Sequence, residues 1–399
     1  MKKSLFIAKR FVLCTIFALI SFYTSLAADV WDGTTLTEPQ VNGNNAYIVT
    51  SGAELAWIAN ESNKGEAYTH DFVLANDIDL GKHPWKPIGH NANTTTKNYF
   101  AGNIDGQGFT IKGLYIESSA SDTNVGFIGG FGGEAAKTTI IKNLNLEGEI
   151  IVSTCSNADI GTLIGFANDL QEITNCHSNV SINYTASDVT AHGNYLGGLV
   201  GRMKGTNIKN SSYSGTIIIA ETATMKNGWG GLLGSYNSST SGLTATIENC
   251  TFEGVINSHT TATLKYGSAI VGYANLSKGT TTIKNNIAKG SMSATTKPTY
   301  YGIWCGKTGG TVDISDNYTD HFTLDGEEQT TLPGAGTDPD PEPDPDPQPD
   351  DGITRVLCIG NSFTVDAVED YLSPICRSVG KKVIIGYPYK GGTTLEQHM

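Results

Sequence analysis

Short apolar runs that alternate with polar residues fill the middle of this chain. In Cys250–Phe252 an apolar residue stands on each side of a polar one, the run Ile217–Ile219 is β-branched throughout, and Gly, Asn, Ser and Thr bound such runs. An apolar period of two predicts β-strands, because successive side chains of a strand point to opposite faces. Between residues 111 and 317 no stretch has a helix-length amphipathic pattern, so the sequence excludes a helical solenoid.

One phrase repeats along this region at intervals of roughly 30 to 39 residues. Each copy opens with isoleucine, a polar residue and asparagine, and it ends in a small apolar cluster rich in glycine. The copies begin at Ile141, Ile173, Ile208, Ile247 and Ile283, with variants at Ile111 and Ile314. A single copy cannot bury its own apolar face, whereas copies stacked about 4.8 Å apart share a continuous core. The sequence therefore predicts an all-β fold, a parallel β-solenoid over residues 111–325.

The third position of the phrase is asparagine in five consecutive copies. Asparagine tolerates the left-handed backbone of a tight turn and bonds to neighbouring groups there. We expect these side chains to stack as an internal ladder; the alternative is that each caps only its own turn. The residues are Asn143, Asn175, Asn210, Asn249 and Asn285.

The glycine-rich clusters resemble the core of the GLUG family, which is named for its Gly-Leu-hydrophobic-Gly sequence. Residues 198–201 and 231–234 match that core as written, and the other copies depart from it. The resemblance covers about half of the chain. It implies secretion and a surface or adhesin-like context, and it brings no catalytic residues.

Different segments flank the repeats. Residues 1–27 have a basic start, an apolar run and small residues before a cleavage point, which predicts a signal peptide. Residues 28–114 are expected to form a cap with the first strands, in which Ser51 and Glu54 make a capping box for a short helix across the open end. Residues 326–352 are rich in alternating acids and prolines, so we predict an extended linker there.

Residues 353–399 change character and predict a strand-helix-strand unit. The strand that ends near Ile359 is followed by Gly360-Asn361-Ser362, and a second strand precedes Gly391 and Gly392. This order resembles the start of the SGNH or GDSL hydrolase family, in which the serine is the nucleophile. The resemblance implies that Ser362 attacks an ester, and that its own N–H and that of Gly391 or Gly392 hold the oxyanion.

The acid and the base of that family lie farther along than this sequence reaches. We therefore expect a truncated α/β fragment, SGNH-like and flavodoxin-like, that lacks esterase activity as given. The alternative role for Ser362 is that of a helix N-cap.

Composition and charge narrow the range of partners. Charged residues make up only 16% of the chain and the net charge is −13, which argues against nucleic acid and anionic membrane surfaces. The apolar run of the signal is too short to span a bilayer, so we do not expect an integral membrane protein. We expect export to the medium or to the outer surface of a bacterium, with a Gram-negative host favoured.

The cysteines predict buried free thiols. Cys176 and Cys250 occupy the same position two coils apart, which is too far for a disulfide. The remaining cysteines have no metal-like spacing. Neither a metal nor a cofactor is expected.

Two candidate ligand sites lie on the rod. Aromatic residues recur just before the glycine clusters, at Tyr195, Trp229, Tyr266, Tyr300 and Tyr301, and an exposed column of them would suit sugar rings; the alternative is packing in the core. Acids near the cap could line a cleft for polysaccharide cleavage, or could cap turns. They are Asp77, Asp79 and Asp105, with His83 and Trp85 beside them.

Three functions follow from these observations. The first is a binding or adhesive solenoid directed at glycans or at a host surface. The second is a secreted SGNH-type carbohydrate esterase whose catalytic domain only begins in this sequence. The third is a β-helix enzyme that degrades polysaccharide.

Overall fold

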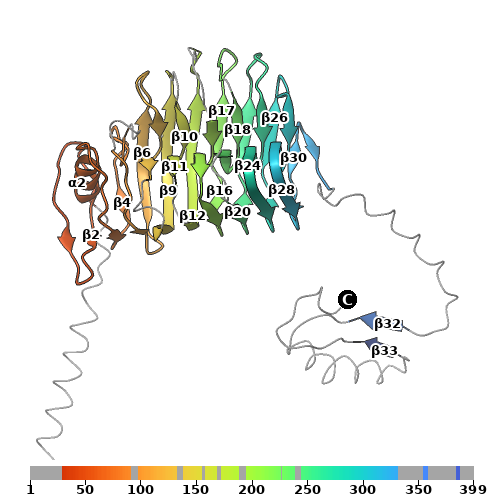
Figure 1. The fold of residues 1–399 in the computed structure, drawn as a ribbon, viewed down its shortest axis with the longest axis horizontal. Coiled ribbons are helices and arrows are strands. Elements are labelled where there is room, and N and C mark those ends of the chain that lie inside the picture. Colours follow the sequence, from red (N-terminus) through yellow and green to blue (C-terminus); the bar gives the residue numbers. More distant parts are fainter. Residues whose placement is uncertain are drawn as a thin grey trace, which may run out of the picture. The chain divides into compact units, whose positions relative to one another are not determined.

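The repeats stack as a parallel β-solenoid, as the sequence predicts (Figure 1). The computed structural model describes residues 29–90, 98–132, 138–154, 158–168, 172–187, 195–225, 227–238 and 244–330, and the strands 354–357 and 383–386. The isoleucines that open the phrases pair in register from coil to coil. The column consists of Ile104, Ile141, Ile173, Ile208, Ile247, Ile283 and Ile314.

Each coil contributes strands to five columns, and the long strands pass through more than one of them. The first column holds β7 (Asn124–Val125), β10 (Asp159–Gly161), β13 (Tyr195–Gly197), β18 (Gly228–Gly230), β23 (Tyr266–Ser268) and β27 (Tyr300–Gly302). The second holds β8 (Ile128–Phe131), β11 (Ile164–Asn168), β14 (Val200–Lys204), β19 (Leu233–Ser238) and the first parts of β24 (Val271–Lys284) and β28 (Cys305–Ser315).

The third column carries the isoleucines. It holds β2 (Tyr47–Val49), β3 (Phe72–Leu74), β5 (Ile104–Asp105), β9 (Ile140–Val152), β12 (Glu172–Tyr184), β15 (Asn207–Lys209) and β20 (Ala245–Glu248), and then the second parts of β24 and β28. β4 (Ile78–Asp79) and β6 (Thr110–Glu117) pair with each other, and β6 pairs with β9.

The last two columns continue from β12. The fourth holds β16 (Ser212–Tyr213), β21 (Thr251–Phe252), β25 (Ile287–Ala288) and β29 (Tyr318–Thr319). The fifth holds β17 (Thr216–Ile219), β22 (Val255–Ser258), β26 (Ser291–Ala294) and β30 (Thr323–Leu324). β31 (Glu327–Glu328) folds back antiparallel on β30, and β1 (Gln40–Val41) does so on β2.

The stack begins earlier than the repeated phrase. Parallel pairing runs from β2 through β3 to β5, so Tyr47, Phe72 and Ile104 already stand in the isoleucine column. The assignment of Ile111 to the first copy of the phrase is wrong, because Ile111 pairs with Ile78 and Leu146 and belongs to the neighbouring strand. The first equivalent of Ile141 is Ile104.

A helix covers this first end of the stack. α2 (Gly52–Ser62) starts at the expected capping box, in which the Ser51 hydroxyl accepts from the Glu54 N–H and the Glu54 carboxylate accepts from the Ser51 N–H. Leu55 and Ile58 are fully buried against the first coil. The helix therefore shields the apolar end of the core from water.

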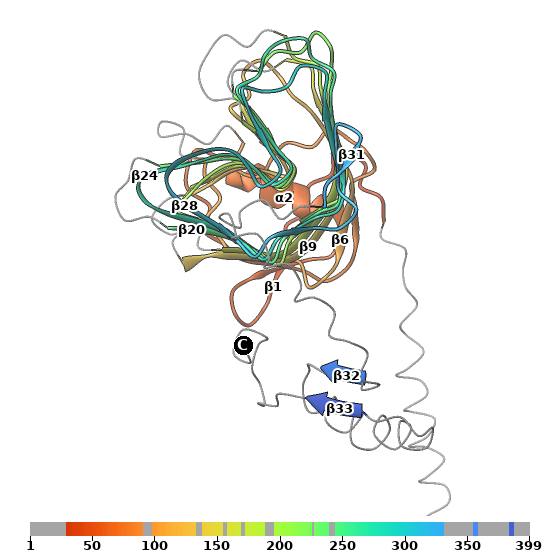
Figure 2. The ribbon, with the colours of Figure 1, turned by 90° about the vertical axis from the view of Figure 1, so that its right-hand side faces the viewer.

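The walls of the first and second columns meet in an inward angle, which Figure 2 shows in a view along the stack. The glycine-rich clusters form this angle. A side chain at Gly198 would overlap the carbonyl oxygen of Gly231 and the ring of Tyr213. Glycine is needed here because the backbones of successive coils approach too closely for a Cβ.

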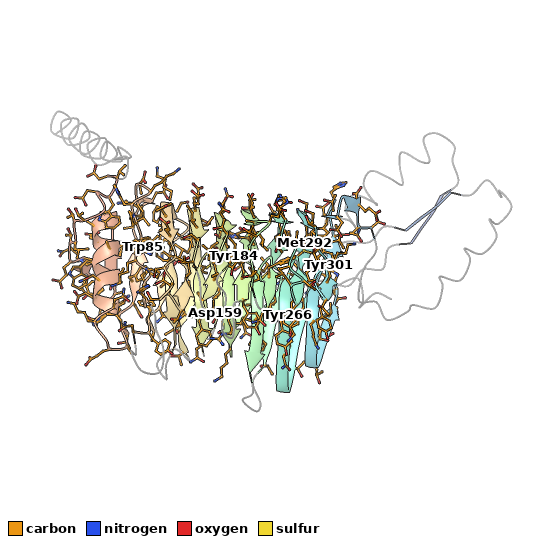
Figure 3. The ribbon with its side chains drawn as sticks, turned by 90° about the horizontal axis from the view of Figure 1, so that it is seen from above. Trp85, Asp159, Tyr184, Tyr266, Met292 and Tyr301 are labelled. Carbon is orange, nitrogen blue, oxygen red and sulfur yellow. The ribbon has the colours of Figure 1, made fainter. Side chains whose placement is uncertain are left out.

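The core inside the coils is a continuous file of apolar side chains. Trp85 stacks on Phe127 near the first end, and Tyr213 stacks on Phe252 farther along. Figure 3 locates Trp85, Tyr184 and Met292 along this file. All three side chains are buried, so the core runs through most of the stack.

Residues 335–399 form a second unit. Its two described strands, β32 (Thr354–Leu357) and β33 (Val383–Gly386), pair in parallel, with Thr354 opposite Val383. A parallel pair requires a crossover connection between its strands. The helix that the sequence analysis expects between the two strands lies outside the described residues.

Candidate functional site

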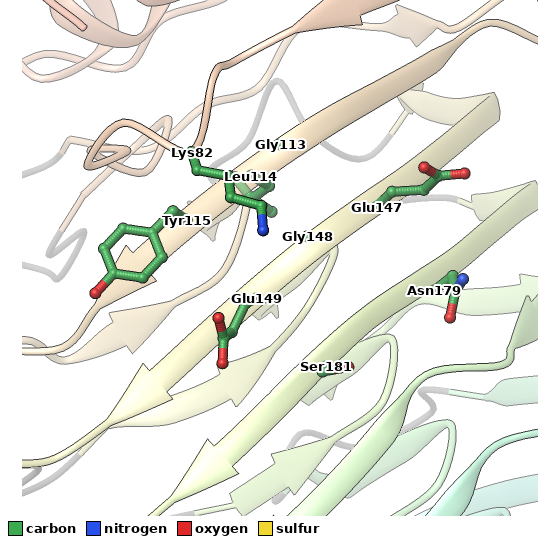
Figure 4. A pocket seen from close by; sticks show the side chains of 9 residues that line it. All are labelled: Lys82, Gly113, Leu114, Tyr115, Glu147, Gly148, Glu149, Asn179 and Ser181. Atoms are coloured by element: carbon green, nitrogen blue, oxygen red, sulfur yellow. The ribbon is translucent and has the colours of Figure 1, made fainter.

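An open groove lies on the outer face of the solenoid, across β6, β9 and β12 (Figure 4). It measures about 480 Å³ and has nine lining residues: Lys82, Gly113, Leu114, Tyr115, Glu147, Gly148, Glu149, Asn179 and Ser181. Apart from Lys82, which lies in the turn after β4 (Ile78–Asp79), the polar side chains come from parallel strands of three neighbouring coils. The groove is therefore built on rigid elements.

A β-bulge creates the groove. The pairing of β6 with β9 slips by one residue between Ile111 and Leu114, where Gly113 takes a φ of 68°. Opposite the slip, Gly148 has a φ of 154°, and a side chain on it would overlap the Leu114 carbonyl group. The two glycines thus adopt the backbone conformations that the bulge requires. A bulge of this kind changes the direction in which the neighbouring side chains project from the sheet.

The strand register groups the polar side chains of the groove. Tyr115, Glu149 and Ser181 form one row across three strands, and Glu147 and Asn179 form another. Both glutamates are exposed to solvent. An aromatic ring, two carboxylates, an amide and a hydroxyl therefore share one open surface.

Neighbouring groups fix two of the lining residues. The Tyr115 hydroxyl donates to the Glu117 carboxylate over 3.4 Å. The Lys82 N–H donates to the Gly113 carbonyl oxygen over 2.9 Å, and Lys82 itself takes a left-handed φ of 57°. The sequence analysis missed this groove, and the only signal for it was a pair of glycines inside otherwise regular strands.

The aromatic residues expected to bind sugars do not form an exposed column. Trp229 is fully buried in the core, where its indole N–H donates to the Met292 sulfur over 3.5 Å. Tyr195 and Tyr266 are also buried, and Tyr301 is partly buried with its hydroxyl donating to Asp325. Tyr195, Trp229 and Tyr266 therefore pack against neighbouring side chains, which is the alternative to sugar binding given for them above.

Register explains why these aromatics separate. Trp229 pairs with Leu196 and Gly267, whose positions face the core, whereas Tyr195 and Tyr266 stand one residue earlier. A shift of one residue in a strand reverses the face. Tyr195 and Tyr266 therefore lie outside the core cluster, in the inward angle between the two walls.

Four rings in that angle form what we call the tyrosine stack: Tyr195, Tyr273, Tyr266 and Tyr300. Tyr273 comes from the opposite wall, and its ring lies 4.6 Å from that of Tyr266 at an interplanar angle of 4°. Gly228, which occupies the tyrosine position of the intervening coil, leaves room for this inserted ring. The stack closes the angle by packing.

An ion pair between Arg202 and Asp159 lies in the same inward angle. Asp159 belongs to β10, the strand that pairs with the strand of Tyr195 on the side of the preceding coil. The Arg202 Nε lies 2.7 Å from Asp159 Oδ2, and the guanidinium lies 4.3 Å from the centroid of the Phe166 ring. Asp159 is buried, and the loss of water around its carboxyl raises its pKa to about 7, against the opposing effect of Arg202. This carboxyl is therefore the one in the angle most sensitive to pH near neutrality.

The asparagines of the repeated phrase stand outside the core. All five take left-handed φ values between 47° and 54°, and Asn175, Asn210, Asn249 and Asn285 are exposed. Asn175 donates to Asn143 over 2.8 Å, and Asn143 donates to Asp105 over 3.0 Å. The expectation of an internal ladder is therefore corrected: these residues form an outer column at a corner.

The internal polar column lies one residue later. Asn286 and Asn317 are buried, and the Asn286 amide donates to the Ile247 carbonyl oxygen and to Asn317 Oδ1, each over 2.9 Å. The Cys250 N–H donates to Asn286 Oδ1 over 2.9 Å. Cys176 and Cys250 occupy the same column as free, buried thiols whose pKa values burial raises to about 12.

Asp77, Asp79 and Asp105 do not line one common cleft; Asp105 lines a second groove, of about 280 Å³, to which Asp77 and Asp79 do not contribute. Asp79 contacts Lys112 and accepts from the Gly81 N–H, and Asp105 contacts Lys142. Asp77 accepts from the Thr110 N–H. The nearby aromatics are also engaged, since His83 lies against Trp31 and Trp85 is buried. The alternative, in which these acids cap turns and pair with lysines, describes them.

Several predicted features lie outside the described residues. They are the signal peptide (1–27), most of the linker, Ser362, Gly391, Gly392, Cys155, Cys358 and Cys376. Among the residues that the structure does describe, no three His, Cys, Asp or Glu side chains gather as metal ligands. None of the helices in the described part of the chain combines the length and the apolarity of a bilayer-spanning segment.

Comparison with known proteins adds partial matches. Residues 355–399 match a family model described as a domain of unknown function (DUF4886). The chain is 30% identical over 159 residues to the "Putative Gly-rich membrane protein" of Evansella cellulosilytica, covering 38% of this chain and 17% of that protein. It is 30% identical over 178 residues to Halomucin of Haloquadratum walsbyi, covering 43% and 2%. The chain thus spans a small part of the length of these curated relatives.

Two solved structures are similar to part of this chain. One is described as the crystal structure of a "putative immunoglobulin A1 protease" from Bacteroides ovatus, with a TM-score of 0.47 and 14% identity over 74% of this chain and 82% of that one. The other is described as "IgA1 Protease", with a TM-score of 0.34 and 16% identity over 73% of this chain and 21% of that one. The class of the described repeats, a parallel β-solenoid, is set by their own strand pairing.

Proposed function

We propose that this protein is a secreted or cell-surface binding rod, and that the groove across β6, β9 and β12 binds a glycan chain. The observation that carries the proposal is the groove itself, in which the ring of Tyr115 lies among two carboxylates, an amide and a hydroxyl on rigid strands. Sugar hydroxyls donate to carboxylates, and the apolar face of a sugar ring packs on an aromatic ring. The open shape suits a polymer that passes along the surface.

The arrangement of the two glutamates favours binding over cleavage. Glu147 and Glu149 are two residues apart on one strand, so both side chains project from the same face. A glycosidase instead places two carboxyl groups on either side of the bond that it breaks. Both glutamates are also exposed, whereas a catalytic acid acts from a buried, apolar setting.

Surface localisation is part of the proposal. The predicted signal peptide, the resemblance of the repeats to GLUG sequences and the partial match to a relative named as a Gly-rich membrane protein support it. The low charge and the abundant Gly, Thr, Ser and Asn of the repeats agree with an extracellular rod.

A glycan array probed with the full chain tests the proposal, followed by titration of the best oligosaccharide by calorimetry. Tyr115→Ala should weaken binding roughly tenfold, because it removes the stacking ring. Tyr318→Ala is the matched control, since Tyr318 is 46% exposed and lies away from the groove. Equal affinity of Tyr115→Ala and the unaltered chain, with both folded by circular dichroism, would contradict the proposal.

A second candidate function concerns residues 355–399. We propose that these residues begin an SGNH-like hydrolase unit in which Ser362 is the nucleophile; the resemblance of residues 360–362 to that family carries this proposal, and the parallel pairing of β32 with β33 is compatible with it. The test is hydrolysis of a short-chain aryl ester by the full chain and by Ser362→Ala. The chain as given is expected to be inactive, so turnover that Ser362→Ala abolishes would assign the nucleophilic role to the serine and would overturn that expectation.

A further inference from the structure

Among the residues that the structure describes, nothing covers the far end of the solenoid as α2 covers the first end. Among the described residues, β27 pairs only with β23, and β28 pairs only with β24. β31 covers only the short strand β30. Figure 2 faces this end, with β28 along the rim and α2 at the back.

Backbone donors of the last coil face this open edge. In the coil before, the Val271 N–H donates to Trp304 O over 3.1 Å, and the Asn285 N–H donates to Ser315 O over 3.3 Å. The equivalents of the donors Val271 and Asn285 in the last coil are Cys305 and Asp316, which have no following coil in the described part of the chain. An uncovered edge of this length is a template for pairing with another strand.

The core side chains of the last coil are also incompletely covered. Val312 and Ile314 are only partly buried, whereas their equivalents Thr281 and Ile283 are fully buried one coil earlier. The indole N–H of Trp304 is buried without a hydrogen-bond partner. The end of the stack therefore has both the free backbone groups and the apolar surface of an interface.

The proline-rich stretch that follows the solenoid is a poor candidate to cover this edge. Positions 339, 341, 343, 345 and 347 are prolines, which carry no N–H, and acids stand between them. A segment of that composition cannot donate the regular hydrogen bonds of a strand. A second copy of the chain has no such restriction.

The edge strand is complementary to itself. Lys307 and Asp313 lie equally far on either side of Gly310, where the strand bends with a φ of 74°. If two β28 strands meet antiparallel about a twofold axis through Gly310, Lys307 of each copy faces Asp313 of the other. Opposite charges directly across an antiparallel pair stabilise it. Lys307 also donates to the Tyr300 hydroxyl over 3.0 Å, which holds its side chain on the outer face.

From these observations we propose that two copies of the chain associate end to end through antiparallel pairing of their β28 strands. The interface is the same patch on both copies, so it closes as a dimer. The opposite ends are covered by α2 and β1 and do not continue the assembly into a filament. This association is independent of the proposed glycan groove, and it would place two grooves on one longer rod.

Charge reversal in the full chain tests the dimer and its register together. Sedimentation velocity over a concentration series should show a monomer–dimer equilibrium for the unaltered chain. Lys307→Asp or Asp313→Lys alone places like charges opposite each other twice, and should raise the dimer dissociation constant at least about tenfold. The double variant Lys307→Asp with Asp313→Lys restores the pairs and should restore the dimer.

A charge reversal far from the proposed interface serves as the control. Lys64→Glu reverses an exposed lysine at the α2 end and should leave the equilibrium unchanged. Hydrogen exchange of residues 305–315 should slow as the dimer forms. A chain that is monomeric at all concentrations overturns the proposal, as does a dimer that both single reversals leave intact or that the double variant does not restore.

Discussion

At the scale of single residues, the left-handed residues at the corners of the coils determine which of the following side chains point into the core. Along a straight strand the faces alternate, so Ile283 points inward and Lys284 outward. The next residue, Asn285, takes a φ of 54° at the corner and also faces solvent, and Asn286 then turns inward. The rule of alternation fails at a left-handed residue, which is why the sequence located the internal ladder one position too early.

The two neighbouring asparagines should therefore differ sharply in their effect on stability. Asn286→Ala leaves the Cys250 N–H without its acceptor inside the core, and should lower the free energy of unfolding by about 2–3 kcal/mol. Asn285→Gly keeps the left-handed corner and should change it by less than about 0.5 kcal/mol. Urea denaturation followed by circular dichroism measures both, and equal losses would refute the assignment of an inner and an outer column.

Asp159 predicts a pH dependence of stability. Burial raises its pKa to about 7, above the value near 3.9 of an unfolded chain, so the folded state favours the protonated acid. The stability that this group contributes is complete below about pH 4 and is lost as the pH rises through 7. Asp159→Asn cannot ionise and should escape that loss.

The measurement is the free energy of unfolding of Asp159→Asn relative to the unaltered chain, at pH 4 and at pH 8. The difference should move in favour of the variant by about 4 kcal/mol between the two pH values, because each unit of difference between the folded and unfolded pKa corresponds to about 1.4 kcal/mol. Glu147→Gln, at an exposed carboxylate, should show no such change. A flat difference for Asp159→Asn would mean that Arg202 holds the carboxylate ionised throughout.

At the scale of elements, the glycine-rich clusters were recognisable in the sequence, but their reason was not. They are required because neighbouring coils touch through their backbones at the inward angle, and no local pattern reports a contact between coils. The aromatic residues before the clusters show the same limit. Trp229 and Tyr195 look equivalent in sequence, yet one residue of register sends the first into the core and the second out of it.

Substitution of a glycine at the inward angle should lower the stability of the fold. A methyl group at Gly231 would overlap the Ala269 carbonyl oxygen and the Phe252 ring, so Gly231→Ala should lower the free energy of unfolding by roughly 2–4 kcal/mol. Gly43→Ala is the control, because nothing lies within 4 Å of a Cβ there. Thermal melts of the two variants should separate clearly, and similar melting temperatures would refute the close approach at the angle.

At the scale of the whole solenoid, the repeat and its period of two were sufficient to predict parallel stacking, and the capping box of Ser51 and Glu54 was sufficient to predict the helix of the cap. They were insufficient to place the groove, because a bulge at Gly113 depends on how two strands of unequal length pair. They also missed the first coils, since Tyr47 and Phe72 join the isoleucine column without carrying the phrase. Stacking needs a shared register, and a shared sequence is only one way to obtain it.

The account rests on coils that stack in one register, and distances along one outer column test this most directly. Glu117, Ile151, Asn183, Ile218, Asn257 and Ser293 pair in succession, so Glu117 and Ser293 are five strand spacings apart. Spin labels attached through a ketone-bearing amino acid at these two positions avoid the native thiols. Double electron–electron resonance should give a single narrow distribution centred about 24 Å, from a spacing of about 4.8 Å for each strand. A broad distribution, or one centred well beyond 30 Å, would contradict the stack.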